Sequence, residues 1–219
     1  MAKIDLVYDT LREMIVAGEL PPGSPIDKAG LADRLGASRQ PVSGAIDRLA
    51  FEGLVEVIPQ HGSFVSKLDQ AGIADWFLVR AGLEAEFAAR FAGDERAPLA
   101  ALDRNIRYQA VAFKAGDLAG FHELDLGFHA IITGFTISPE AHAVLSRAEA
   151  NLGRVRRLLL PEPGRAVKTL AEHRAIFEAL ERRDCGAAAA AMRGHISSVA
   201  GLFQRFIEGH PGAVLGRRR

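Results

Sequence analysis

The stretch that decides the fold is LADRLGASRQPVSGAIDRLAFEGLVEVIPQHGSFV, residues 31–65. Within it, Ser38 precedes a run whose apolar residues recur at helical spacing, and a serine at that position favours the start of a helix. Gly53 ends the run. Two short segments, 54–58 and 63–66, follow with β-strand character and enclose a Pro-Gln-His-Gly turn. The stretch therefore predicts a helix followed by a β-hairpin.

Two further helical patterns precede this helix. Residues 5–17 carry apolar side chains at helical spacing, and the Leu-Pro-Pro-Gly run at 20–23 stops them. Asp27 is placed to cap a second short helix, and Gly36 begins a tight turn after it. The order helix, helix, turn, helix, hairpin predicts a winged helix-turn-helix DNA-binding domain over residues 1–67.

The character of the sequence changes after about residue 69, where strand patterns give way to helical ones. The predicted helices are 69–91, 96–115, 117–134, 138–159, 166–182 and 184–208. We expect a linker at 68–72, an all-α domain over 73–209 and a frayed tail over 210–219. The predicted fold class is mostly α: an N-terminal winged helix-turn-helix with a small β-hairpin, followed by an all-α helical bundle of about six helices.

Composition bounds the class of protein. The chain has 219 residues, of which 48% are hydrophobic and 25% are charged, as in ordinary folded proteins. Cys185 is the one cysteine, so the chain has no internal disulfide, which fits a reducing compartment. The sequence lacks a signal-peptide pattern and any uncharged apolar run of the roughly 18 residues that a membrane span needs. We expect a cytoplasmic protein without membrane contact.

A recognition helix places its N-terminal side chains on base edges in the major groove. The residues predicted to contact DNA from this position are Ser38, Arg39, Gln40 and Ser43. Arg39 suits a guanine edge and Gln40 an adenine edge. At the tip of the wing, His61 and Gly62 are expected to approach a phosphate or the minor groove.

Charge favours the alternative, an ordinary helical subdomain with polar residues on its face. Residues 1–67 carry seven basic and nine acidic side chains, a net charge of −2, although the whole chain is neutral. Phosphate neutralisation normally supplies much of the affinity for DNA. A dimer with local positive patches would bind with modest affinity and strong salt sensitivity.

The helical part contains a constellation typical of a metal site. Asp125 and His129 are four residues apart, so they share one face of a helix. His173 and His195 lie among the apolar positions of two other predicted helices. One carboxylate and three imidazoles suit a divalent ion, zinc first, with nickel or manganese as alternatives. The ordinary alternative is that the histidines are core residues and that Asp125 and His129 form an i,i+4 pair.

Residues 7–65 resemble the DNA-binding domain of the GntR family of regulators almost without gaps. The matching pieces are the ELPPG turn, the LADRLGASRQPV helix-turn-helix and the EGLVEVIPQHGSFV strand and wing. The resemblance implies DNA binding. Pro25 stands where the family commonly has arginine, and Ser43-Gly44 where it commonly has Arg-Glu. These departures affect operator sequence and affinity, and Gly44 costs the helix about 1 kcal/mol relative to alanine.

Residues 73–207 resemble the FCD effector domain of the FadR subfamily. The matching pieces are VRAGLEAEFAARFA, FHELDLGFHAIITG, LAEHRAIFEALERRD and AAAAAMRGHI. In metal-binding members the ligands are an Asp-x-x-x-His pair and one histidine in each of the EHRAI-like and MRGHI-like segments. The resemblance implies Asp125, His129, His173 and His195 as ligands here. The ITGFTISPEAH segment departs from the family, which often has a short loop with asparagine.

The same resemblance gives candidate effector contacts. Arg80 precedes Glu84 by four residues, so an intrahelical ion pair is the plain interpretation. In the FCD pattern Arg80 also faces the interior, where it could hold a carboxylate in bidentate fashion. Asn151, and Arg154 or Arg156, are further candidates for lining the cavity.

Three functions remain open at this point. The first is a ligand-gated repressor or activator: a homodimer binds a palindromic double-stranded DNA operator, and a small organic acid at the metal modulates its affinity. The second is a metal-dependent hydrolase. Against this function, the sequence shows no additional general base, no nucleophile motif and no phosphate-binding loop. The third is a regulator whose metal is purely structural. The first is the predicted function, so we expect no catalytic residues.

Overall fold

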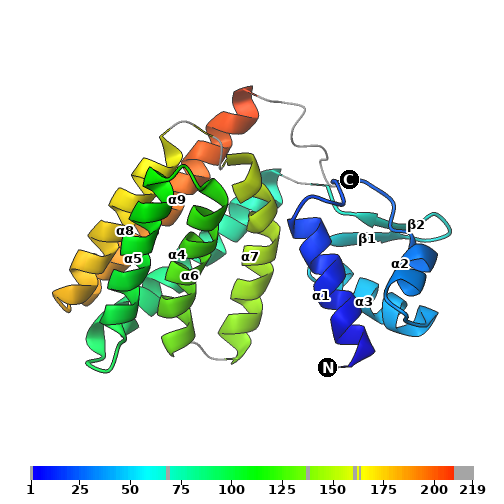
Figure 1. The fold of residues 1–219 in the computed structure, drawn as a ribbon, viewed down its shortest axis with the longest axis horizontal. Helices are drawn as coiled ribbons and strands as arrows, with labels where there is room; N and C mark the ends of the chain where they lie inside the picture. Colours follow the sequence, from blue (N-terminus) through cyan, green and yellow to red (C-terminus); the bar gives the residue numbers. More distant parts are fainter. Residues whose placement is uncertain (1, 68–69, 137–138, 160–161, 163, 210–219) are drawn as a thin grey trace.

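The computed structural model of the chain describes residues 2–67, 70–136, 139–159, 162 and 164–209. In this part of the chain, three helices and a hairpin form a small N-terminal domain, which lies beside a bundle of six longer helices (Figure 1). The predicted fold class is confirmed. The predicted tail at 210–219 lies outside the described residues, as do residues 68 and 69 of the predicted linker, whereas 70–72 begin the first helix of the bundle.

The N-terminal domain has the element order that the sequence predicts. Its elements are α1 (Lys3–Val16), α2 (Lys28–Arg34), α3 (Arg39–Phe51), β1 (Val55–Ile58) and β2 (Gly62–Val65). The core forms where buried apolar residues of α1, among them Leu11 and Ile15, meet Ile46 and Leu49 of α3. The two strands pair antiparallel, with Val55 opposite Val65.

The caps of this domain follow the sequence in one case and depart from it in another. Asp27 caps α2, because its Oδ1 accepts hydrogen bonds from the backbone N–H groups of Ala29 (3.1 Å) and Gly30 (3.0 Å). Ser38 occupies the N-cap position of α3, but its side chain accepts no capping hydrogen bond from the described residues. The predicted serine cap is therefore wrong as a side-chain interaction. Ser38 instead lies exposed at the start of the recognition helix.

Six helices make up the described part of the helical domain. They are α4 (Gln70–Gly93), α5 (Leu99–Lys114), α6 (Leu118–Thr136), α7 (Pro139–Leu159), α8 (Arg165–Glu181) and α9 (Cys185–Gly209). The predicted helix at 96–115 begins later, at Leu99, because Pro98 takes the N-cap position and Arg96 folds back onto Asp94 in a turn. No helix within the described ranges is long and apolar enough to cross a membrane.

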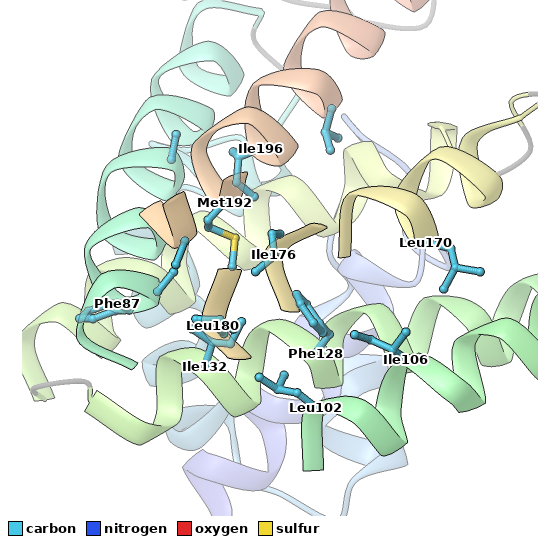
Figure 2. Close-up of a cluster of buried hydrophobic side chains, with 14 of the residues drawn as sticks. Phe87, Leu102, Ile106, Phe128, Ile132, Leu170, Ile176, Leu180, Met192 and Ile196 are labelled. Atoms are coloured by element: carbon cyan, nitrogen blue, oxygen red, sulfur yellow. The ribbon is translucent and has the colours of Figure 1, made fainter. Parts of the chain in front are cut away.

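The core of this domain receives buried side chains from all six of these helices. Figure 2 shows Phe128 and Ile132 of α6 facing Ile176 of α8, with Met192 and Ile196 of α9 above them. All five side chains are buried completely. The polar cluster described below is set into this apolar core, on the same helices.

The two domains meet along α7, which lies beside α1 (Figure 1). Ala150 of α7 is buried within the core of the N-terminal domain. Gly153 follows one turn later, and a Cβ atom at this position would lie 2.8 Å from Cγ1 of Val16 in α1. The absence of a side chain at residue 153 therefore lets the two helices approach closely.

Candidate metal centre

Three helices bring four potential metal ligands together. Asp125 and His129 share one face of α6, His173 comes from α8 and His195 from α9. One ligand atom of each residue lies within 4.8 Å of the corresponding atoms of the others. The three histidines are at most 2% exposed, and Asp125 is 13% exposed on its side chain. The four residues predicted from the sequence thus lie in one cluster.

A hydrogen-bond acceptor holds the Nδ1 atom of each histidine. The pairs are His129 with Glu84 Oε2 at 2.5 Å, His173 with Gln109 Oε1 at 2.9 Å, and His195 with Glu172 Oε2 at 2.8 Å. The amide of Gln109 is oriented by its own Nε2, which donates to Asn105 Oδ1 at 2.7 Å. Because these oxygens only accept, each Nδ1 carries the proton, and in a neutral imidazole the Nε2 atom then presents a lone pair.

The Nε2 atoms converge on one point. Those of His129 and His195 lie 3.3 Å apart, and His173 Nε2 lies 3.5 Å from Asp125 Oδ1. His173 Nε2 is buried and has no hydrogen-bond partner among the described residues. Lone pairs and a carboxylate that face each other without donors repel, and a divalent cation removes that repulsion. Three imidazoles and one carboxylate are a donor set that zinc accepts, so the residues present fit a bound ion.

The surroundings of His173, His195 and Asp125 favour the protonation states that bind metal. Burial lowers the pKa of His195 to about 4 and that of His173 well below its usual value, so both imidazoles are neutral at neutral pH. Burial alone would raise the pKa of Asp125, but the positive charge of Arg156 and the neighbouring histidines outweigh it and lower that pKa. Neutral imidazoles and an ionised carboxylate are the forms that coordinate a cation.

A cavity opens beside the cluster. Its volume is about 40 Å³, it is partly open to solvent, and Asp125 and His195 form part of its wall. Three arginines from three helices also line it: Arg80 of α4, Arg156 of α7 and Arg165 of α8. The cavity therefore lies between the candidate metal ligands and a set of cationic side chains.

Arg80 forms the intrahelical ion pair predicted from the sequence and also faces the cavity. Its Nε is ion-paired with Oε1 of Glu84, and the same carboxylate accepts from His129 through Oε2. Arg80 also lines the cavity, although its side chain is only 1% exposed. Glu84 thus links the arginine of the cavity wall to a candidate metal ligand.

Asn151 lies away from this cavity, at the contact between the domains. Its Nδ2 donates to the backbone carbonyl of Glu52 at 3.0 Å and to that of Arg147 at 2.9 Å. Arg154, also considered from the sequence, donates to the carbonyl of Ser66. Of the candidates on α7 considered from the sequence, Arg156 is the one in the cavity wall.

Sequence reasoning missed the residues that orient the histidines. Glu172 directly precedes His173 in the EHRAI segment, so it could have been noticed, yet it contacts His195 and not its neighbour. Gln109 gave no signal, because a single glutamine on an amphipathic helix resembles any other polar residue. Arg165 gave none either, since it follows the helix-breaking Pro-Glu-Pro-Gly stretch at 161–164.

The predicted DNA-contacting residues are all exposed on the N-terminal domain. Ser38, Arg39, Gln40 and Ser43 lie at the beginning of α3, and His61 and Gly62 lie at the tip of the hairpin. Gln60 has a φ of 63° and so makes the tight turn of that tip. Recognition helix and wing are thus presented to solvent together.

A winged helix-turn-helix joined to a helical domain with an arginine-lined cavity defines a class of protein, the two-domain transcription regulators. Residues 3–65 match the family described as "Bacterial regulatory proteins, gntR family", and residues 75–198 match the FCD domain. The chain belongs to the GntR family and is a DNA-binding transcription regulator with an FCD effector domain. Its family consists of regulators and not of enzymes, which agrees with the sequence-based expectation.

Known relatives span most of the chain. The HTH-type transcriptional repressor RspR of Escherichia coli K12 is 31% identical over 89% of this chain and 86% of its own length. An uncharacterised HTH-type regulator from an unstable DNA locus of Streptomyces ambofaciens is 36% identical over 88% of this chain and 81% of its own length. Among solved structures, E. coli McbR/YncC has the same fold, with a TM-score of 0.78 and 20% identity over 94% of this chain and 99% of that protein.

Proposed function

We propose that the chain is a ligand-responsive regulator in which a small organic acid, bound at a divalent metal in the helical domain, changes the affinity of a homodimer for a palindromic operator. The observation that carries this proposal is the convergence of three imidazole Nε2 atoms and Asp125 at the wall of a cavity lined by arginines. Zinc is the proposed metal, with nickel and manganese as alternatives.

Asp125, His129, His173 and His195 would hold the ion. A bound divalent ion would act as a Lewis acid that coordinates a carboxylate oxygen of the ligand. Arg80 would bind a second ligand oxygen, since its guanidinium lines the cavity and its Nη2 finds no hydrogen-bond partner in the described part of the chain. Glu84 would hold Arg80 and His129 in fixed positions.

α7 is the proposed route from this site to the DNA-binding domain. At one end of the route, Nη1 of Arg156 lies 3.9 Å from Oδ2 of Asp125. Two residues earlier in α7, Arg154 donates to the carbonyl of Ser66 at the end of the wing. Further along the helix, Arg147 donates to the carbonyl of Phe51 at 2.9 Å, at the end of the recognition helix. A shift of Arg156 on ligand binding would therefore move groups that α7 holds at both the wing and α3.

The proposed binding to a palindromic operator follows from the two-fold symmetry of a homodimer. In a homodimer, two recognition helices read half-sites that are one helical turn or a multiple apart. A change in the spacing of the two heads changes how well both fit the same operator. The ligand can act only through different affinities for the two arrangements.

A thermal-shift measurement on purified protein tests the proposal, with a panel of small carboxylates and with the protein either zinc-loaded or chelator-treated. A ligand at 100 times its Kd adds roughly 2.7 kcal/mol, a shift of several degrees. We expect stabilisation by carboxylates only when zinc is present. If chelator lowers the melting temperature and no carboxylate raises it, the metal is structural and the effector proposal is wrong.

A further inference from the structure

The charges of the arginines and carboxylates around the cavity cancel one another. Three arginines and three carboxylates lie here, none of whose side chains is more than 18% exposed: Arg80, Arg156, Arg165, Glu84, Asp125 and Glu172. Two more exposed charges act on these residues and cancel each other: the partly exposed Glu149 acts on Arg156, and the exposed Lys168 lies 3.9 Å from Oε1 of Glu172. An imidazole that binds the ion through its Nε2 lone pair and keeps its proton on Nδ1 carries no charge, so a bound divalent ion brings the whole group to a net charge of +2.

Such an excess is costly in a buried site, because the charges are removed from water and have no counterion. The cost is already visible between the arginines. Burial is the main reason that the pKa values of Arg156 and Arg165 are lowered, and the positive charge of Arg80 lowers both further. An anion between these guanidinium groups would relieve the repulsion.

Two unused donors indicate where such an anion would bind. Nη2 of Arg80 and Nη1 of Arg156 are buried and have no hydrogen-bond partner in the described ranges. Their side chains are 1% and 10% exposed, and both line the cavity. They come from different helices, α4 and α7, so a ligand whose first carboxylate is held by the metal and Arg80 would find the donor of Arg156 available to a second anionic group.

We infer that the ligand is a small organic dianion with its two charges on separate groups, such as a dicarboxylate, and that Arg156 and Arg165 bind the second group. This inference rests on the proposed function, since it takes the first carboxylate to lie at the metal. It narrows the ligand from any small carboxylate to one whose charge matches the excess of +2. Arg156 and Arg165 are then the residues that determine specificity.

Calorimetric titration of zinc-loaded full-length protein tests the inference with ligands that differ by a single carboxylate. Two pairs of probes are compared: succinate with butyrate, and malate with 2-hydroxybutyrate. In the second member of each pair, a methyl group replaces one carboxylate of the first. Inorganic phosphate, whose charges lie on one group, tests whether separation matters. We expect each dicarboxylate to bind at least about tenfold more tightly than its partner, as one charged hydrogen-bonded contact provides.

Arg156→Gln and Arg165→Gln should each remove most of this preference, while binding of the monocarboxylates changes less than about twofold. Arg174→Gln, an exposed arginine on the other face of α8, is the matched control. Zinc content is measured for every variant, because Arg156 lies near Asp125. Two variants on different helices keep the test valid if one of them fails to fold.

The outcomes separate the two proposals. Equal affinities within each pair, or phosphate binding as tightly as the dicarboxylates, would overturn the dianion inference and leave the carboxylate-at-metal proposal standing. If neither member of a pair binds to zinc-loaded protein, both are wrong. A preference for dicarboxylates that survives in both arginine variants would remove Arg156 and Arg165 from the site.

Discussion

Asn151 of α7 donates a 3.0 Å hydrogen bond to the backbone carbonyl of Glu52, the C-cap residue of the recognition helix α3. The last carbonyls of a helix have no partners within it. Here side chains of the effector domain supply the hydrogen-bond donors for these carbonyls. Besides Asn151, Arg147, one turn earlier in α7, donates to the carbonyl of Phe51. Its guanidinium also lies over the ring of Phe51, 4.7 Å from the centroid. The end of the recognition helix is thus held by the neighbouring domain.

Asn151→Ala should therefore weaken the coupling between ligand and DNA without affecting the ligand site. Loss of this partly buried hydrogen bond costs about 1 kcal/mol, so we expect the ligand-induced change in operator affinity to fall roughly fivefold. Fluorescence anisotropy with and without carboxylate measures it, and calorimetry shows whether ligand affinity is unchanged. Gln204→Ala on the exposed face of α9 is the control. Normal coupling in Asn151→Ala would exclude this contact from the route.

Gly153→Ala tests the same contact by adding atoms. The new Cβ would lie 2.8 Å from Cγ1 of Val16, and a β-branched side chain in a helix has little freedom to move aside. We expect the closed contact between α7 and α1 to loosen and the operator affinity to lose most of its dependence on ligand. Val16→Ala removes the clashing methyl, so the double variant should regain the dependence. If the double variant behaves like Gly153→Ala, the effect is a general loss of stability.

Periodicity and turn residues were sufficient to predict the fold. Gly53 falls between α3 and β1, and Gly116 and the Pro-Gly stretch at 161–164 fall between helices that the structure places within a few residues of their predicted bounds. Local signals cannot report how helices approach one another. Gly44 costs the recognition helix stability by propensity, yet a Cβ there would lie 2.6 Å from Cδ1 of Ile4. Its lack of a side chain lets α1 pack against α3.

The candidate metal ligands could be predicted from the sequence, whereas the residues that orient them could not. Histidine and aspartate are rare enough on inward helix faces that the four candidate ligands could be chosen by spacing and resemblance. Their hydrogen-bond partners could not, because Glu84, Gln109 and Glu172 come from helices whose rotation only the packed bundle fixes. The sequence also could not show that Asn151 faces the DNA-binding domain. Asn151 and the cavity-lining Arg156 lie little more than one turn apart on the same helix, α7.

His173→Ala should lower zinc occupancy while leaving the protein folded. The imidazole supplies one of four donor atoms, and its Nε2 makes no other hydrogen bond within the described structure. Metal analysis after dialysis against a weak chelator measures occupancy, and circular dichroism checks the helices. Full occupancy in this variant would rule out the four-ligand arrangement.

Gln109→Leu tests the orientation of that histidine without touching the metal. The buried amide oxygen accepts from His173 Nδ1 at 2.9 Å, and leucine has a similar volume but no acceptor. Loss of such an outer partner typically lowers metal affinity ten- to a hundredfold, and we expect about that for zinc by competition with a chelating dye. Gln204→Leu is the matched exposed control. Unchanged zinc affinity would mean that packing alone orients His173, whose ring stacks on Phe128 at 4.0 Å between centroids.

Arg39→Ala tests the DNA-reading face. Arg39 is exposed at the first position of α3, and the domain around it has a net charge of −2, so few other cations can replace its contact. We expect loss of binding to an operator obtained by selection from random DNA, with the oligomeric state unchanged by light scattering. A bidentate contact to guanine contributes about 1–3 kcal/mol of discrimination. Arg34→Ala, an exposed arginine in the last turn of α2, is the control. If Arg39→Ala weakens all sequences equally and reduces the salt dependence by about one ion, Arg39 contacts a phosphate and not a base.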